Sequence, residues 1–110
     1  MSSELNKIEY LVYADGSSPF KEWFYGLKDE RARAKIHARI LRLERGNFGD
    51  FKFLGEGVYE LRIHYNPGFR IYFGRRNNRT VVIINGGIKK SQRKDIQKAK
   101  ELWKDYSDEN

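Results

Sequence analysis

The order of hydrophobic and polar residues along the chain predicts a small sheet. Residues 8–13 alternate well enough for a first strand, which the sequence ADGSS then ends. Residues 57–65 and 69–76 are rich in aromatic and β-branched residues and flank Asn-Pro-Gly, which is typical of a β-hairpin. Residues 79–87 are apolar on both faces, so we expect this strand to lie in the centre of the sheet.

Three other stretches have helical periodicity. Ser18 followed by Pro19 is typical of an N-cap with proline at the first helical position, and apolar residues then recur at helical spacing. A second helix is predicted over residues 29–45, with a strongly basic outer face. A third helix is predicted to begin at the cap Ser91, and residues 107–110 are predicted to form a frayed tail.

The predicted element order is β-α-α-β-β-β-α. Residues 46–57 contain four glycines and are predicted to form an irregular loop or a loop with a short strand. This order favours an α+β fold, in which a twisted and mainly antiparallel sheet has its helices packed on one face. The other face is expected to stay partly open.

The hairpin can be paired so that its apolar faces coincide. If residues 66–68 form the connection, the predicted apolar pairs are Tyr65 with Phe69, Ile63 with Ile71 and Leu61 with Phe73. The polar pairs in the same register are His64 with Arg70, Arg62 with Tyr72 and Glu60 with Gly74. This register gathers two guanidinium groups, an imidazole, a carboxylate and a phenol on the face that the helices leave open.

Composition and charge favour a polyanionic partner, with nucleic acid first. The 110 residues carry 22 Lys and Arg against 15 Asp and Glu, which gives a net charge of +7. Zero cysteines exclude disulfides, thiolate zinc sites and cysteine nucleophiles, and the two histidines have no metal-ligand spacing. The length fits one domain over residues 1–110, and without an apolar run or leader pattern we expect a cytoplasmic protein away from membranes.

The polar face of the hairpin has the groups that metal-free RNA cleavage needs. A base must deprotonate a 2′-hydroxyl, cations must stabilise the charged phosphorane, and an acid must protonate the leaving oxygen. Glu60, His64 and Tyr72 are the acid and base candidates. The competing interpretation is an exposed ion-pair network around Glu60 and Arg62, a solvated His64 and a packing role for Tyr72.

The residues as an ordered set resemble a known family. GVYELRIHYNPGFRIYFGR, an apolar strand and then NGGIKKSQRKDIQKAKEL are similar to the RelE/ParE superfamily of type II toxins. The HigB-like, phage-related addiction module killer branch is the most similar, and the element order agrees over residues 8–106. The resemblance implies an endoribonuclease that cuts mRNA in the ribosomal A site, uses no metal or organic cofactor, and is a monomeric toxin unit blocked by a cognate antitoxin.

Site residues follow from the resemblance by motif position. Arg70 and then Arg62 match the basic residues that orient and stabilise the phosphate. Lys89 or Lys90 matches a basic residue beyond the last strand, and Glu60 and Tyr72 follow as further catalytic candidates. The residues predicted to bind RNA are Lys52, His64, Arg39, Arg42, Arg45, Arg93 and Lys94. The chain departs from the best-known RelE members at Glu60, where they carry a lysine, and near Asp95, where they carry a tyrosine.

Two other functions stay open at this point. A ParE-like toxin would share the fold and inhibit DNA gyrase by binding, without nuclease chemistry. A non-enzymatic basic module would bind nucleic acid through phosphate contacts from the helix over residues 29–45. That helix could equally be held by the antitoxin or meet ribosomal RNA.

Overall fold

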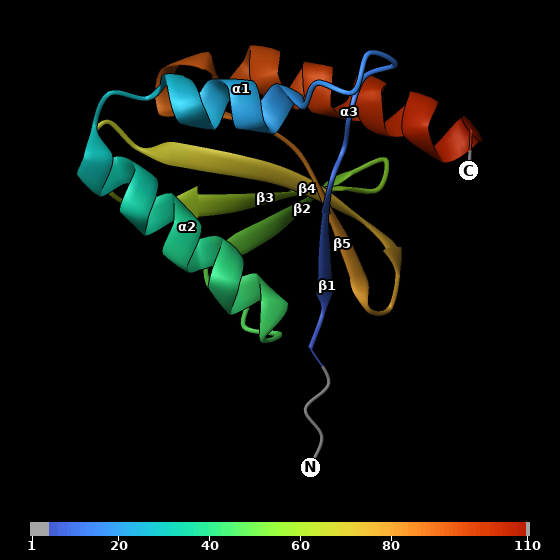
Figure 1. Cartoon of the computed structure of the whole chain (residues 1–110), viewed down its shortest axis with the longest axis horizontal. Coiled ribbons are helices and arrows are strands. Elements are labelled where there is room, and N and C mark those ends of the chain that lie inside the picture. The colour runs from blue at the N-terminus through green and yellow to red at the C-terminus, as the bar shows by residue number, and fades with distance from the viewer. Residues whose placement is uncertain (1–4, 110) are drawn as a thin grey trace.

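The computed structural model describes residues 5–109 and confirms the α+β class (Figure 1). The elements in chain order are β1 (Lys7–Tyr10), α1 (Pro19–Gly26), α2 (Glu30–Glu44), β2 (Phe51–Gly55), β3 (Val58–Ile63), β4 (Phe69–Asn77), β5 (Thr80–Ile88), a 3-10 turn (Lys89–Ser91) and α3 (Gln92–Glu109). The predicted order β-α-α-β-β-β-α therefore lacked one strand. For the glycine-rich segment 46–57, two alternatives were predicted: an irregular loop, or a loop with a short strand. The second alternative is correct, and β2 is that strand.

The starts of α1 and α2 lie where their capping residues predicted them. The Ser18 hydroxyl accepts a hydrogen bond from the Lys21 amide at 3.1 Å, and Pro19 occupies the first turn. The Asp29 carboxylate accepts from the amides of Arg31 and Ala32, at 3.0 and 3.1 Å. Each cap satisfies amides that have no partner inside the helix, so the local sequence is enough to fix these two boundaries.

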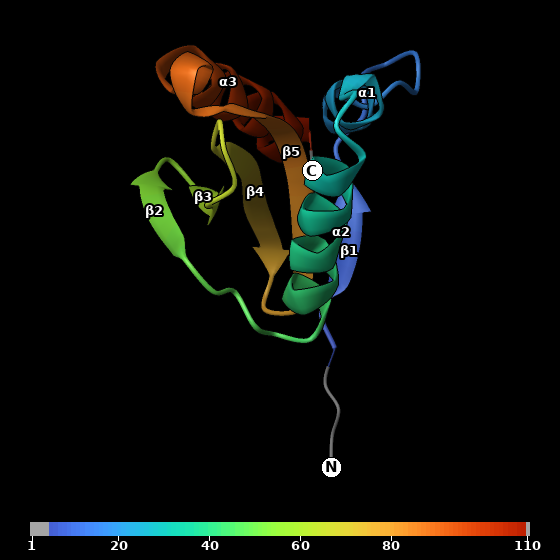
Figure 2. The ribbon, with the colours of Figure 1, turned by 90° about the vertical axis from the view of Figure 1, so that its left-hand side faces the viewer.

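The sheet has the strand order β1-β5-β4-β3-β2. β1 runs parallel to β5, and the other neighbouring pairs are antiparallel, so the prediction of a mainly antiparallel sheet is confirmed. β5 has a neighbour on each side, which confirms its predicted central position. β1 and β2 form the two edges, and Figure 2 shows how far the sheet twists between them.

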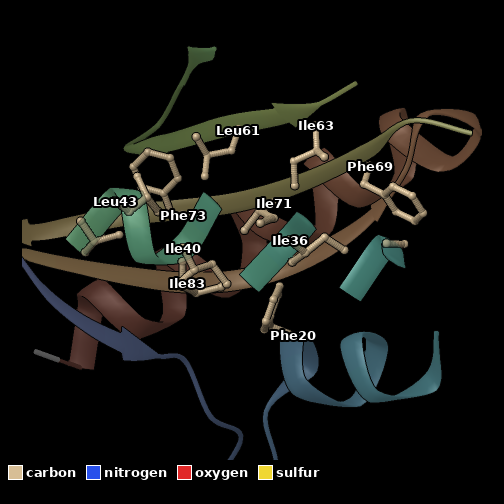
Figure 3. Packing of buried hydrophobic residues seen from close by; sticks show 12 residues of the cluster. Phe20, Ile36, Ile40, Leu43, Leu61, Ile63, Phe69, Ile71, Phe73 and Ile83 are labelled. Atoms are coloured by element: carbon tan, nitrogen blue, oxygen red, sulfur yellow. The ribbon is translucent and has the colours of Figure 1, made fainter. Parts of the chain in front are cut away.

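The prediction that the helices pack on one face is wrong. α1 and α2 cover one face, which we call the α2 face, where Phe20 and Ile36 pack against Ile71 and Ile83 (Figure 3). α3 covers part of the opposite face, the α3 face (Figure 2). The buried hydrophobic residues of the α3 face and of the helix that covers it are Leu11, Val58, Tyr72, Val82, Ile84, Ala99 and Trp103. The central strands are apolar on both sides, so the second side also needs a covering helix.

The hairpin register differs from the predicted one by two residues. Ile63 pairs with Phe69 and Leu61 with Ile71, and the connection is the longer segment 64–68. On the polar face, Arg62 lies opposite Arg70 and Glu60 opposite Tyr72. A two-residue shift leaves every side chain on its predicted face, so the alternation of apolar residues could not distinguish the two registers.

The last helix is longer than predicted. α3 continues to Glu109, so residues 107–109 of the predicted frayed tail are helical, while Asn110 lies outside the described residues. Within residues 5–109, no helix combines the length and the apolar character needed to cross a membrane.

A glycine in β5 allows α1 to approach the sheet closely. A Cβ atom at Gly86 would overlap the indole ring of Trp23, whereas a Cβ at Gly26 would have no atom within 4 Å. We predict that Gly86→Ala lowers the free energy of unfolding by about 1–3 kcal/mol because the ring must move. Gly26→Ala should not lower it. Urea denaturation of both variants checks this, and equal stabilities would contradict the packing of α1 on β5.

Candidate functional site

Five of the predicted site residues lie in two neighbouring rows across the sheet. Arg62 on β3 is paired with Arg70 on β4, which is paired with Gly87 on β5. In the next row, strand pairing aligns Lys52, Glu60, Tyr72 and Asn85. Directly paired residues share a face, so these side chains all belong to the α3 face, near the start of α3.

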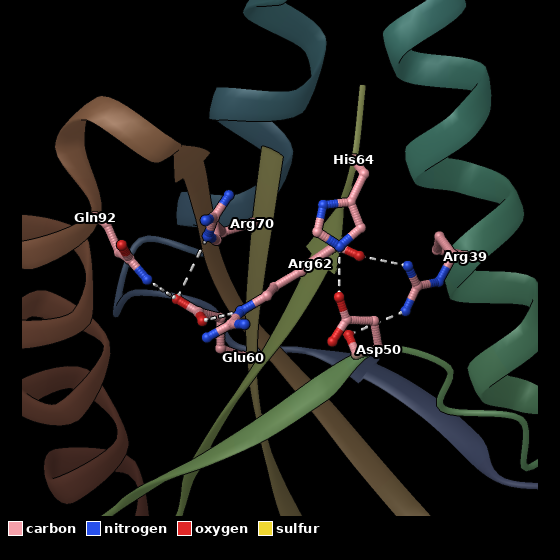
Figure 4. Close-up of polar contacts among 7 residues, drawn as sticks. All are labelled: Arg39, Asp50, Glu60, Arg62, His64, Arg70 and Gln92. Atoms are coloured by element: carbon pink, nitrogen blue, oxygen red, sulfur yellow. Dashed lines mark hydrogen bonds and ion pairs between the residues drawn. The ribbon is translucent and has the colours of Figure 1, made fainter. Parts of the chain in front are cut away.

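Glu60 is the centre of the site. Its side chain is fully buried, and Oε1 accepts a hydrogen bond from Nε of Arg62 at 3.1 Å. Oε2 accepts from Nε2 of Gln92 at 2.7 Å and lies 3.8 Å from Nε of Arg70 (Figure 4). These four residues, Glu60, Arg62, Arg70 and Gln92, form the Glu60 cluster. It joins β3, β4 and the first residue of α3, and the carboxylate is buried instead of lying in an exposed ion-pair network.

The Glu60 cluster has more positive than negative charge. The Arg62 side chain is 31% exposed and that of Arg70 10%, and both share the single Glu60 carboxylate. Like charges directly opposite each other on neighbouring strands destabilise a sheet unless an anion compensates them. A guanidinium pair presents forked donors that fit phosphate oxygens, so the cluster has the chemistry of a phosphate-binding site.

Lys89 lies beside the hairpin connection, next to Arg70. Its amide donates a hydrogen bond to the Gly68 carbonyl at 3.0 Å. A Cβ atom at Gly68 would lie 3.4 Å from Nη1 of Arg70 and 3.4 Å from Cβ of Lys89, so both residues border this glycine. The exposed cations that follow along the chain are Lys90, Arg93 and Lys94. The structure thus places these predicted residues beside the Glu60 cluster or in the first turn of α3.

Tyr72 lies below the Glu60 cluster, covered by α3. It is fully buried, and in the described part of the chain its hydroxyl has no hydrogen-bond partner. Burial raises the pKa of Tyr72, and the nearby carboxylates of Glu60 and Asp95 raise it further. The phenol is therefore neutral at physiological pH, so as it stands it could donate a proton but would not act as a base.

The start of α3 is held by a short chain of polar contacts. The Ser91 hydroxyl donates to the Asp95 carboxylate at 2.5 Å, and Nδ2 of Asn85 donates to the Asp95 carbonyl at 3.3 Å. These contacts fix the position of the helix end that carries Gln92. Gln92, Asn85 and Ser91 were not among the predicted site residues, and the only sequence signal for Gln92 was its place in the first turn of a helix that follows β5.

His64 lies elsewhere than predicted. β3 ends at Ile63, so His64 is not paired with Arg70, and its Nε2 atom lies 2.5 Å from the Asp50 carboxylate. The histidine side chain is 73% exposed. The hydrogen bond from His64 is the main cause that lowers the pKa of Asp50, and the charge of Arg62 adds to it. An exposed imidazole oriented by a carboxylate therefore lies near Arg62.

The three arginines predicted on α2 lie on the opposite side of the sheet from the Glu60 cluster. Arg39 donates to the backbone carbonyls of Arg62 and Phe48, at 2.5 and 2.9 Å, and so holds the segment before β2 in place. Arg42 and Arg45 are exposed. A structural role is clear for Arg39, and RNA binding by the three arginines stays a prediction.

Across residues 5–109, no group of three or more His, Cys, Asp or Glu side chains is arranged to hold a metal ion.

Comparison with known proteins adds a family and a bacterial relative. Residues 22–104 match the family model described as "Phage derived protein Gp49-like (DUF891)". The chain is 48% identical over 83 residues to a protein of Haemophilus influenzae (strain ATCC 51907 / DSM 11121 / KW20 / Rd) described as "Uncharacterized protein". That match covers 76% of this chain and 84% of the relative. The region that matches the family model includes the whole Glu60 cluster.

The burial of Glu60 makes a prediction about stability. Glu60→Gln keeps the size of the side chain but leaves the buried Arg70 without a counter-charge, so we expect the free energy of unfolding to fall by about 3–5 kcal/mol. The matched control is Glu56→Gln, because Glu56 is 72% exposed and pairs with Lys100 at 3.2 Å. The control should change stability by at most about 1 kcal/mol. Equal effects in urea denaturation would show that the cluster is not the buried ion pair described above.

Proposed function

The chain belongs to the family of Gp49-like phage-derived proteins, and from this premise we propose that it is the toxin of a type II toxin-antitoxin module. The proposed activity is that of an endoribonuclease of the RelE and HigB-like kind, which cuts mRNA on the ribosome without a metal. A cognate antitoxin would bind one toxin unit and block its basic surface. The proposed place of action is the cytoplasm, where the ribosomes lie.

The observation that carries this proposal is the pairing of Arg62 with Arg70 above the buried Glu60 carboxylate. Two guanidinium groups in register and one carboxylate leave a net positive charge at a fixed point of the sheet. Preorganised cations of this kind stabilise the extra negative charge of a phosphorane, which is the demanding part of RNA cleavage. A gyrase inhibitor that acts by binding alone would not need this arrangement.

The proposed reaction is attack of a ribose 2′-hydroxyl on the adjacent phosphate. A base removes the hydroxyl proton, the 2′-oxygen bonds to phosphorus, and the bond from phosphorus to the 5′-oxygen breaks. The leaving 5′-oxygen takes a proton, and the products are a 2′,3′-cyclic phosphate and a 5′-hydroxyl. Arg62 and Arg70 would hold the non-bridging oxygens through these steps, and Lys89 or Lys90 would bind the phosphate from the side of the 3-10 turn.

The proton-transfer roles differ among the three candidates. Both oxygens of Glu60 are occupied by Arg62, Arg70 and Gln92, so we assign it the task of positioning the arginines. His64 is exposed and oriented by Asp50, which makes it the accessible base or acid. Tyr72 would take part only if the start of α3 moved to uncover its hydroxyl.

The proposal predicts the effect of removing either guanidinium. We expect induced wild-type protein to arrest bacterial growth and to leave new mRNA ends inside translated frames, mapped by primer extension. Arg62→Ala and Arg70→Lys should reduce cleavage by about 10²–10³-fold, because each loses a donor to the transition state. His64→Asn should reduce it as well.

The matched control is Arg76→Ala, since Arg76 is an exposed arginine of the same strand that pairs with Glu9 at 2.8 Å. This variant should cleave like wild type. Circular dichroism of each purified variant separates loss of activity from loss of fold. Growth arrest with intact transcripts would contradict the nuclease proposal, and a DNA-damage response in those cells would favour gyrase inhibition. Binding to nucleic acid without arrest or cleavage would favour the non-enzymatic module.

A further inference from the structure

The edge strand β2 exposes two phenyl rings. Phe51 is 45% exposed and Phe53 is 55% exposed, and both side chains lie on the α2 face, opposite Leu61 and Tyr59 of β3. The other exposed large apolar residues among those described lie on separate segments of the chain: Leu5, Val12, Tyr25 and Leu41. Exposed rings on the edge strand of a sheet favour aggregation unless a binding partner covers them. Phe51 and Phe53 therefore mark a candidate binding surface.

The two rings are held in place by other aromatic residues. Phe51 lies 5.4 Å from the ring of Phe48 and 6.3 Å from that of Tyr59. Phe53 lies 5.0 Å from Tyr59, which is itself stacked on Phe73 at 5.1 Å. Each ring is therefore packed on one side against other aromatic rings and exposed to solvent on the other side. A flat ligand could stack on Phe51 and Phe53 with little loss of side-chain conformational entropy, because the two side chains are already held in place.

Three cations lie on or near the segment that carries these rings: Lys52, Arg75 and Arg42. Lys52 lies between the two phenylalanines in sequence and belongs to the opposite face, in register with Glu60. On the α2 side, the Arg75 guanidinium lies 5.3 Å above the Phe48 ring. A Cβ atom at Gly49 would lie 3.4 Å from Nη2 of Arg42, so this arginine borders the segment before β2. The one acid of the segment 46–55, Asp50, is occupied by His64.

We propose that the β2 edge, consisting of Phe51, Lys52 and Phe53, is a subsite on which bases of single-stranded RNA stack. The proposal rests on the proposed function, because it continues the path of the RNA whose phosphate lies at Arg62 and Arg70. Lys52 is the cross-strand neighbour of Glu60, so a strand that leaves the Glu60 cluster towards the edge passes this lysine first. It then meets the two rings on the other side of the edge.

The combination of exposed rings and cations favours RNA as the occupant. Single-stranded nucleic acids bind where a positively charged groove follows the backbone and aromatic side chains stack on the bases. Stacking of this kind tolerates any base, so the subsite would hold the message without setting its sequence. A protein partner is the other possible occupant, and the experiment below distinguishes the two.

The test is the affinity of the full chain for a labelled 12-nucleotide single-stranded 2′-O-methyl RNA, measured by fluorescence anisotropy. This probe lacks the 2′-hydroxyl and cannot be cut by the proposed reaction. Phe51→Ala and Phe53→Ala should each weaken binding by roughly tenfold. Phe53→Leu should weaken it similarly, because leucine keeps the apolar packing but not the stacking surface.

Salt dependence separates the ring and charge contributions. Lys52→Ala should reduce the slope of log affinity against log salt by about 0.7, the value for one lost contact to a single-stranded phosphate. The phenylalanine variants should leave this slope unchanged. Tyr25→Ala is the matched control, because Tyr25 is 73% exposed on α1 and lies outside the β2 edge. It should change affinity less than twofold.

The subsite would be overturned if the phenylalanine variants bound the probe within twofold of wild type, or if Phe53→Leu bound like wild type. Loss of antitoxin binding in those variants, with RNA affinity intact, would assign the edge to a protein partner and likewise overturn the proposal. The failure of the nuclease proposal is seen separately. If the wild-type protein never cuts mRNA but binds the probe through Phe51 and Phe53, the nuclease proposal is wrong and the subsite proposal is supported.

Discussion

The burial of one carboxylate between two arginines is the interaction on which the rest of the site depends. A buried charge without partners would destabilise the fold strongly, so Glu60 requires Arg62, Arg70 and Gln92 around it. Because these partners come from β3, β4 and α3, the same requirement fixes how the helix begins on the sheet. The two guanidinium groups are in turn held in a geometry that neither strand would impose alone.

The helix that covers the α3 face explains why the site is half buried. α3 packs Ala99 and Trp103 against the apolar part of that face and leaves its polar rows at the helix start. The arginines therefore lie at a boundary, with protein below and solvent beside them, where electrostatic interactions are stronger than on an open surface. The exposed rings of β2 lie one strand further out and on the opposite face, so an RNA that occupied both the proposed phosphate site and the proposed stacking subsite would pass around the β2 edge.

Local chemistry predicted most of the elements, and long-range pairing accounts for what the sequence could not specify. The caps at Ser18 and Asp29 act within three residues, so they placed two helices correctly. The predicted hairpin register was wrong because a shift of two residues keeps every side chain on the same face of the sheet. The predicted side of α3 was wrong because the alternation of apolar and polar residues does not say which helix covers which face. Gln92 was missed for a related reason: it meets Glu60 across 32 positions of sequence, and no spacing rule connects them.

The central claim is that Arg62 and Arg70 form one anion site, and nitrogen-15 NMR of the arginine Nε–H groups tests it directly. Titration of the folded protein with the uncleavable 2′-O-methyl RNA should shift the Nε–H signals of Arg62 and Arg70 together, with one dissociation constant. The signal of Arg76, which pairs with Glu9 at the other end of β4, should not move. RNA that binds while the Arg62 and Arg70 signals stay in place would contradict the account.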